Sequence, residues 1–240
     1  MLAMLTSVTC QKGDLASNLS RHHDLLRVGA EEGSDLVLFP EMSLTGYCAG
    51  AEVPLSSPGV AELVAATRDG PAVCFGLVER AESGGLPYIT QLVAERGHIV
   101  AVHRKEHLGE GEAGHFRAGP GAGVFEVAGL ACSMAICAEI GTSPPYDKPA
   151  SVVLAPSAPG LYGPRRSTDD DWCRGFSWWR GQVVRDAARL LGAGQVLALS
   201  TQAGATDDED FPGGAALFGP GGVVVSALPD WRQGHLVVRL

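Results

Sequence analysis

Short apolar runs alternate with segments of helical periodicity, and this alternation predicts the order of strands and helices. The opening run Leu2–Thr9 is apolar and partly β-branched, which is typical of a strand. Asp14 follows as a candidate N-cap, and apolar residues then recur at helical spacing up to Ala30. The run Asp35–Pro40, apolar after its first residue, predicts a strand buried on both faces. The chain therefore begins as strand, amphipathic helix and buried strand.

The same alternation continues along the rest of the chain. A short helix is expected around Val60–Ala66, and Gln91–Ala94 with His98–His103 should form a hairpin about Gly97. A long helical pattern occupies Asp171–Leu191. Further strands are predicted at Ala72–Val78, Val124–Val127, Ala131–Ile136, Ser151–Leu154, Val196–Ser200, Ala215–Phe218 and Val223–Ser226. Because no repeat or linker divides this pattern, we expect an α/β fold formed by a single domain over residues 1–240.

Composition and charge exclude several classes of function. Lys and Arg number 18 against 27 Asp and Glu, which gives a formal net charge of -9. Such an acidic chain lacks the basic surface expected of a protein that binds nucleic acid or an anionic membrane. The longest apolar runs, such as Gly222–Leu228, are far shorter than the ~18 residues of a membrane-spanning helix. A soluble protein without nucleic-acid or membrane partners is expected.

The amino-terminal segment and the cysteines indicate the compartment. Met1–Lys12 lacks a basic segment followed by an apolar stretch and a cleavage site, so we expect a cytoplasmic protein. The cysteines are scattered without C-x-x-C spacing, which argues against a disulfide framework or a Cys-rich zinc site. We expect most of them to be buried small apolar side chains. They are Cys10, Cys48, Cys74, Cys132, Cys137 and Cys173.

Three polar residues stand where an apolar strand ends, a position that exposes side chains on a rigid scaffold. Glu41 follows the run that ends at Pro40, Lys105 follows Ile99–Arg104, and Cys137 follows Cys132–Ile136. Each residue alone is an ordinary strand end or core residue. Together they supply a base, a cation and a thiol, which are the groups that make a cysteine nucleophile.

The segments around these residues resemble the carbon-nitrogen hydrolase family, also called the nitrilase superfamily, which carries a Glu-Lys-Cys triad. They read LFPEMSLTGY at 38–47, HRKEHL at 103–108 and ICAEI at 136–140. Additional matching segments are FGLVER at 75–80, FRAG at 116–119, APSAP at 155–159 and GGAALFGPGG at 213–222. These segments follow in the family's order and span nearly the whole chain, so their combination is far more specific than any one of them.

The resemblance implies a four-layer αββα sandwich and assigns roles to the three residues. Glu41 would act as general base on the Cys137 thiol and later on water, and Lys105 would stabilise the oxyanion. The backbone N–H of Ala138 is expected as a second oxyanion donor, and Glu139 as a neighbouring substrate-binding residue. Family members often carry an accessory glutamate after the lysine; both Glu110 and Glu112 are candidates, and Glu112 fits the spacing better.

The resemblance also implies a substrate class and partners. A small linear amide is the expected substrate, no metal or organic cofactor is needed, and a homodimer or larger homo-oligomer is expected. This chain departs from the family at Ala138-Glu139, where Tyr-Asp or Glu-Asp is common after the nucleophile. It also departs at 200–204, where STQAG stands in place of an Asn-containing motif. Both departures are expected to reshape the acyl pocket, and the resemblance does not single out one substrate.

Other functions compete with amide hydrolysis. An acyltransferase, a nitrilase or a carbamoylase could use the same thioester chemistry, and a catalytically silent relative could keep the fold. His103 and His107 fit the H-x-x-E-H pattern of inverted zinc peptidases, but the flanking strand pattern and glycines leave too little helix for it. A papain-like pairing of Cys137 with His103, His107 or His115 would leave Glu41 and Lys105 unexplained.

The aromatic residues of the long helical pattern are expected to pack against the sheet or a second subunit rather than to line a pocket. They are Trp172, Phe176, Trp178 and Trp179. The acidic clusters lack the spacing of a calcium loop and are expected to be solvated loops or, at Asp171, an N-cap. They occupy residues 169–171 and 207–210.

Overall fold

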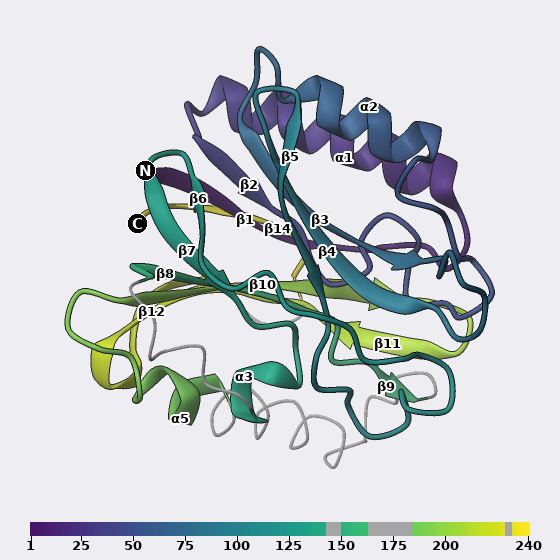
Figure 1. Ribbon diagram of the computed structural model, residues 1–240. Helices are drawn as coiled ribbons and strands as arrows, with labels where there is room; N and C mark the ends of the chain where they lie inside the picture. The colour runs from purple at the N-terminus through teal and green to yellow at the C-terminus, as the bar shows by residue number, and fades with distance from the viewer. Residues whose placement is uncertain (143–149, 163–183, 229–231) are drawn as a thin grey trace.

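The computed structural model describes residues 1–142, 150–162, 184–228 and 232–240, and Figure 1 shows their arrangement. The helices are α1 (Leu15–Glu31), α2 (Pro58–Ala66), α3 (Glu139–Thr142) and α5 (Arg185–Ala188), with a 3-10 turn η3 (Pro220–Gly222). The strands are β1 (Leu2–Val8), β2 (Leu36–Leu38), β3 (Ala72–Glu79), β4 (Tyr88–Glu95), β5 (His98–Arg104), β6 (Phe125–Val127), β7 (Leu130–Met134), β8 (Val152–Ser157), β9 (Leu161–Tyr162), β10 (Val196–Ala205), β11 (Glu209–Pro212), β12 (Ala215–Gly219), β13 (Val223–Ala227) and β14 (Gly234–Arg239).

Strand β1 joins two sheet layers because its neighbours change along its length. Over Leu2–Ser7 it pairs with β14, while β2 lies parallel on its other edge. At Ser7 and Val8 it also pairs with β10, in parallel. One layer therefore has the order β5-β4-β3-β2-β1-β14, and the other has β6-β7-β8-β10-β12-β13. Figure 1 shows α1 and α2 outside the first layer and α3 and α5 outside the second, which is the predicted αββα sandwich.

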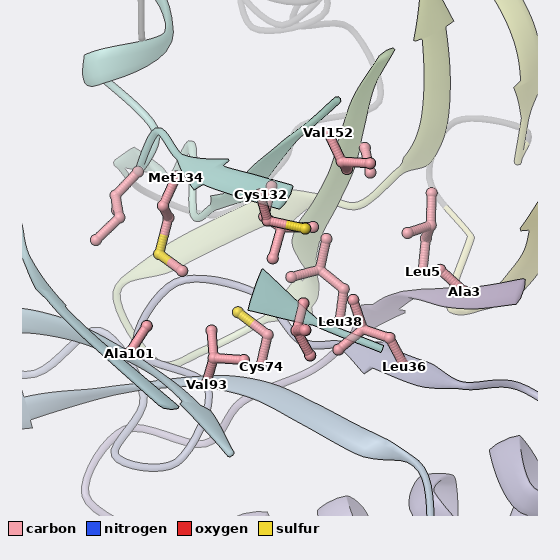
Figure 2. Close-up of a cluster of buried hydrophobic side chains, with 14 of the residues drawn as sticks. Ala3, Leu5, Leu36, Leu38, Cys74, Val93, Ala101, Cys132, Met134 and Val152 are labelled. Atoms are coloured by element: carbon pink, nitrogen blue, oxygen red, sulfur yellow. The ribbon is translucent and has the colours of Figure 1, made fainter. Parts of the chain in front are cut away.

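Apolar side chains fill the spaces between these four layers. Successive residues of a strand point to opposite faces, so Leu36 and Leu38 face the other sheet whereas Val37 faces α1. This explains why the central strands read as continuous apolar runs. Figure 2 shows the space between the sheets, filled from both sides by Ala3, Leu5, Leu36, Leu38, Cys74, Val93, Ala101, Cys132, Met134 and Val152.

The strands that precede the candidate residues all run in the same direction. β2 is parallel to β1, and β5 regains that direction through two antiparallel steps from β3. In the second layer β7, β8 and β10 are parallel to one another, and β10 is parallel to β1. The carboxyl ends of β2, β5, β7 and β8 therefore lie at one end of the sandwich, where open α/β sheets place their sites.

Most predicted elements are present, with small shifts at their ends. The Asp14 side chain accepts a hydrogen bond from Ser17 N and so caps α1 as predicted. The hairpin about Gly97 is formed by β4 and β5. Three strands were not predicted: β14, β9 and β11. Of the long helical pattern predicted at Asp171–Leu191, α5 covers Arg185–Ala188 and ends in a turn at 189–190, short of the predicted end. Residues 171–183, including the tryptophans and Cys173, lie outside the described residues.

The described helices are amphipathic or very short. α1 spans 17 residues, and its exposed face is polar. Within the described ranges, no helix is both long and apolar enough to cross a membrane. The cysteines of these ranges are free thiols: Cys10, Cys74 and Cys132 are buried, and Cys48 and Cys137 are partly exposed.

Candidate active site

Lys105 stands at the end of β5 and lies between two carboxylates. Its Nζ is 2.7 Å from Glu41 Oε1 and 2.8 Å from Glu112 Oε1. The Lys105 and Glu41 side chains have no exposed surface, and Glu112 is also buried. The backbone of Lys105 is fixed as well, because its N–H donates to Ile89 O and its carbonyl accepts from Gly119 N. The structure therefore holds the ammonium in one position beside both carboxylates.

Glu41 follows β2 in a tightly packed turn. Met42, the next residue, has a φ of 49°, and a Cβ at Gly76 would lie 2.3 Å from Met42 N. Only glycine at position 76 lets this turn approach the neighbouring strand so closely. The Glu41 carbonyl accepts a hydrogen bond from Gln202 Nε2 at 2.9 Å. This packing aims the Glu41 carboxyl away from solvent and toward Lys105.

The second oxygen of Glu41 faces the loop that follows β8. Glu41 Oε2 accepts a hydrogen bond from Ala158 N at 3.0 Å. The same N–H favours the thiolate form of Cys137 and lowers the pKa of its thiol, an effect that burial outweighs. The Ala158 backbone therefore holds the Glu41 carboxylate and favours the charged form of the nucleophile.

Cys137 occupies a strained turn at the end of β7. Its φ of 46° lies in the left-handed region that non-glycine residues rarely adopt, and its N–H donates to Pro156 O. Such strain persists where the surroundings hold the backbone, and it gathers at functional sites. The residue is partly exposed, and its thiol is desolvated and lies within electrostatic reach of Glu41 and Lys105.

Burial controls the protonation of the thiol and of Glu41. Desolvation raises the pKa of Cys137 well above its usual range, the charge of Glu41 raises it further, and Lys105 opposes this only in part. Burial also raises the pKa of Glu41 to about 7, against the lowering effect of Lys105. The resting thiol is therefore protonated, and a base with a pKa near neutrality stands beside it.

Lys105 itself stays charged. Burial disfavours its ammonium, but Glu41 and the other anionic groups outweigh this, so the pKa of Lys105 is raised. The carboxylate of Glu112 is fixed in turn by two donors, the Tyr47 hydroxyl at 2.7 Å and the Gly109 N–H. Of the two candidate glutamates, Glu112 contacts Lys105, whereas Glu110 is exposed in the same loop.

The remaining predicted site residues lie beside this cluster in a different arrangement. Ala138 follows Cys137 at the entry to α3, and its carbonyl accepts from Gly141 N. Glu139 was expected to bind substrate, but its buried carboxylate accepts hydrogen bonds from the backbone N–H groups of Ile136, Glu106 and His107. It also pairs with His103 Nε2 at 2.9 Å. These contacts turn Glu139 toward the protein interior.

The histidine alternatives do not match this geometry. His103 lies in strand β5 and His107 in the loop after it, so the helix required by an H-x-x-E-H zinc site is absent from these residues. Both ring nitrogens of His103 already have partners, Glu139 and Ala122 N. His107 and His115 are exposed in the loop after β5. In the described part of the chain, no group of three or more metal-ligating side chains is placed to hold an ion.

Two contributors to the site were missed by the sequence patterns. Ala158 acts through its backbone N–H, which no side-chain pattern reveals. Tyr47 stood inside the matched segment at 38–47 but was given no role, and its hydroxyl now contacts Glu112 while its ring lies against Phe116 and Phe211. Its place within the matched segment was the available signal.

The chain is similar to several known proteins over most of its length. The glutamine-dependent NAD(+) synthetase of Rhodobacter capsulatus is 28% identical over 238 residues, which make up 95% of this chain and 41% of the synthetase. A probable nitrilase of Schizosaccharomyces pombe is 23% identical, with 96% of this chain and 84% of the nitrilase covered. The chain spans about two fifths of the length of the synthetases that it matches.

Solved structures and a family profile complete the comparison. A cysteine-to-alanine variant of the Nesterenkonia AN1 amidase from the nitrilase superfamily matches with a TM-score of 0.82 at 25% identity, covering 100% of this chain and 90% of that one. In another variant of that amidase, 25% identical with a TM-score of 0.79 and coverage of 100% and 93%, acrylamide has added to the active-site cysteine. The sequence profile described as Carbon-nitrogen hydrolase matches residues 4–144, more than half of the chain. The chain therefore belongs to the carbon-nitrogen hydrolase family, the nitrilase superfamily.

Proposed function

We propose that this chain hydrolyses the C–N bond of a small linear amide through a thioester on Cys137. The observation that carries the proposal is the buried Lys105 ammonium held between Glu41 and Glu112, beside a cysteine in a strained turn. A base, a cation and a nucleophile placed together are the groups that acyl transfer requires. The Nesterenkonia amidase supports the choice of an amide among the substrates of the family.

The first half of the reaction forms the thioester. Glu41 takes the proton from the Cys137 sulfur as that sulfur attacks the amide carbonyl carbon. The carbonyl oxygen becomes an oxyanion, which the Lys105 ammonium stabilises. Glu41 then returns the proton to the nitrogen, the C–N bond breaks, and ammonia or an amine leaves.

The second half releases the acid. Glu41 takes a proton from water while the water oxygen attacks the thioester carbon, and Lys105 again stabilises the oxyanion. The C–S bond breaks, the carboxylic acid leaves, and the proton returns to the Cys137 sulfur. The chain supplies every proton transfer and the charge stabilisation from its own residues, so the proposed reaction uses no cofactor.

Glu112 acts in this proposal by holding Lys105 rather than by moving protons. It contacts the ammonium at 2.8 Å and is fixed by Tyr47, so it keeps Lys105 in place when Glu41 becomes protonated. The role of the Ala138 N–H as a second oxyanion donor stays a prediction from the family resemblance. A homodimer or larger homo-oligomer is proposed on the same basis. A single domain over residues 1–240 and a cytoplasmic location are proposed from the sequence patterns alone.

The test is ammonia release from a panel of small amides, with carbamoyl amino acids and nitriles beside them. Glutamine belongs in the panel, because glutamine-dependent NAD(+) synthetases are among the relatives. Wild type is compared with Cys137→Ala, and intact-mass measurement detects the acyl adduct. Ammonia release that depends on Cys137 supports the proposal, whereas turnover that survives in Cys137→Ala contradicts it.

An acyltransferase would form the same thioester and must be separated from a hydrolase. Hydroxylamine is added to the reaction, and the hydroxamate is measured against the free acid. A hydrolase yields mainly the acid in the absence of the added nucleophile. If the thioester accumulates in water and is discharged only by an amine, acyl transfer replaces hydrolysis as the function.

A further inference from the structure

The Glu139 carboxylate connects the two loops that carry Lys105 and Cys137. Its Oε1 accepts from Glu106 N at 2.6 Å and from His107 N at 3.4 Å, both directly after Lys105. Its Oε2 accepts from Ile136 N at 2.7 Å, the residue directly before Cys137. The side chain is buried. One carboxylate thus bridges the backbone next to the cation and the backbone next to the nucleophile.

His103 completes this connection from strand β5. Ala122 N can only donate a hydrogen bond, so His103 Nδ1 accepts it at 3.3 Å and the ring proton lies on Nε2. His103 Nε2 then donates to Glu139 Oε2 at 2.9 Å. His103 therefore directs one more N–H at the carboxylate.

The hydrogen bonds to Glu139 favour the ionised form of its carboxyl group. Burial alone would raise the pKa of Glu139, but the hydrogen bonds from His103 and from the backbone outweigh burial, and the pKa is lowered. A carboxylate has two accepting oxygens and no hydrogen, which suits a site where every described partner is an N–H donor. A neutral amide at this position would direct an N–H₂ group at one of those donors.

We infer that Glu139 is a positioning residue that fixes the distance between Lys105 and Cys137. The two loops belong to different layers of the sandwich, since β5 lies in the first and β7 in the second. The turn at Cys137 is strained and would relax if its neighbour Ile136 lost its acceptor. The inference rests on the proposed function, because it assigns Glu139 a task in bringing the oxyanion stabiliser to the nucleophile.

The test compares Glu139→Gln and Glu139→Asp with wild type. Glutamine keeps the size but loses one acceptor, and aspartate keeps the charge but is one methylene too short to reach both loops. We expect kcat and the rate of Cys137 alkylation by iodoacetamide each to fall about 10-fold or more, with KM changed less than about 3-fold, because an ~1 Å displacement of a catalytic group can cost ~100-fold. Peptide mass spectrometry reports the alkylation, and the partly exposed Cys48 is its internal reference.

Two further variants separate positioning from general loss of stability. Leu63→Ala removes a fully buried side chain of α2 on the far side of the first layer, so it should lower the melting temperature and leave the Cys137 alkylation rate within about 2-fold. His103→Gln can keep an N–H donor toward Glu139 and should retain more activity than His103→Leu. This rescue is not expected if His103 merely fills space.

The inference is overturned if Glu139→Gln alkylates Cys137 at the wild-type rate relative to Cys48. It is also overturned if Leu63→Ala, at an equal melting temperature, loses as much alkylation and kcat as Glu139→Gln. The alkylation comparison does not depend on turnover. Wild-type protein that alkylates at Cys137 but releases no ammonia from any amide would contradict the proposed function, while the alkylation ratio would still decide the role of Glu139.

Discussion

The Lys105 ammonium lies 2.7 Å from the Glu41 carboxylate, and neither side chain has any exposed surface. A second carboxylate, that of Glu112, lies 2.8 Å from the same nitrogen. One cation therefore faces two buried anions, and the cluster would carry a net negative charge if both carboxylates were ionised. Breaking a buried pair of this kind leaves an uncompensated charge, which is more costly than losing a surface ion pair.

Lys105→Met should therefore destabilise the protein as well as abolish turnover. The variant leaves two buried carboxylates without their cation, and we expect the free energy of unfolding to fall by about 3–5 kcal/mol at pH 8. Urea denaturation measures this loss. The double variant Lys105→Met with Glu112→Gln removes one of the two carboxylates and should recover part of the stability without recovering activity. Equal stability of Lys105→Met and wild type would contradict a tightly coupled cluster.

The strained turn at Cys137 makes a prediction about stability that is independent of activity. Because the φ of Cys137 is 46°, glycine fits the turn better than alanine. Both Cys137→Ala and Cys137→Gly should lose all turnover. The free energy of unfolding of Cys137→Gly should nevertheless be about 1 kcal/mol larger than that of Cys137→Ala. Urea denaturation of the two variants checks the difference. A large loss of stability in both would instead indicate a thiol whose main task is core packing.

The proposed base sets the pH dependence of the reaction. Glu41 must be deprotonated to accept the thiol proton, and burial raises its pKa to about 7. We expect kcat/KM to rise with pH and level off above an apparent pKa near 7, which belongs to the coupled cluster rather than to one residue. Rates of ammonia release from pH 5 to 9 give the profile. A profile that is flat from pH 5 upward would contradict Glu41 as the base.

The site residues could be found from the sequence where a side chain ends a buried strand. Glu41, Lys105 and Cys137 follow β2, β5 and β7, and the apolar runs in the sequence predict these three strands, although only β2 is buried along its whole length. Their complementary chemistry and the family resemblance grouped the three residues, and the common direction of these strands in the structure explains why they lie at one end of the sandwich. Glu112 was preferred over Glu110 because it lies four residues before Phe116, a spacing that the family resemblance favours.

Contacts made by the backbone could not be found in this way. Ala158 acts through its N–H, and Glu139 accepts from N–H groups that are far from it in sequence, so no pattern of side chains indicates their roles. Strand β14 was missed because Gly234–Arg239 is short and only half-buried, although it pairs with β1 over Leu2–Ser7. β9 and β11 are shorter still, and only long-range pairing defines them.

A buried histidine behind the Glu41 turn predicts acid sensitivity. His22 lies on α1, stacks on Phe39 at 4.0 Å between ring centroids, and its Nδ1 lies 2.7 Å from Asn18 O. The carbonyl can only accept, so Nδ1 carries the hydrogen and Nε2 accepts from the Ser43 hydroxyl at 2.9 Å. This arrangement has no place for a second proton, and burial lowers the pKa of His22 to about 4.

The sign of the effect follows from proton uptake by the unfolded chain. An unfolded histidine binds a proton below pH ~6.5 whereas native His22 does not until about pH 4, so stability falls as the pH falls through this window. Between pH 7 and pH 5 the loss due to His22 should be about 2 kcal/mol. His22→Gln can keep a partner for Ser43 without titrating, and His23→Gln removes a partly exposed imidazole from the same helix as a matched control. Urea denaturation at both pH values measures the free energy of unfolding. Its loss between pH 7 and pH 5 should be smaller in His22→Gln than in wild type or His23→Gln. Equal losses in all three proteins would show that His22 is not the source of the acid sensitivity.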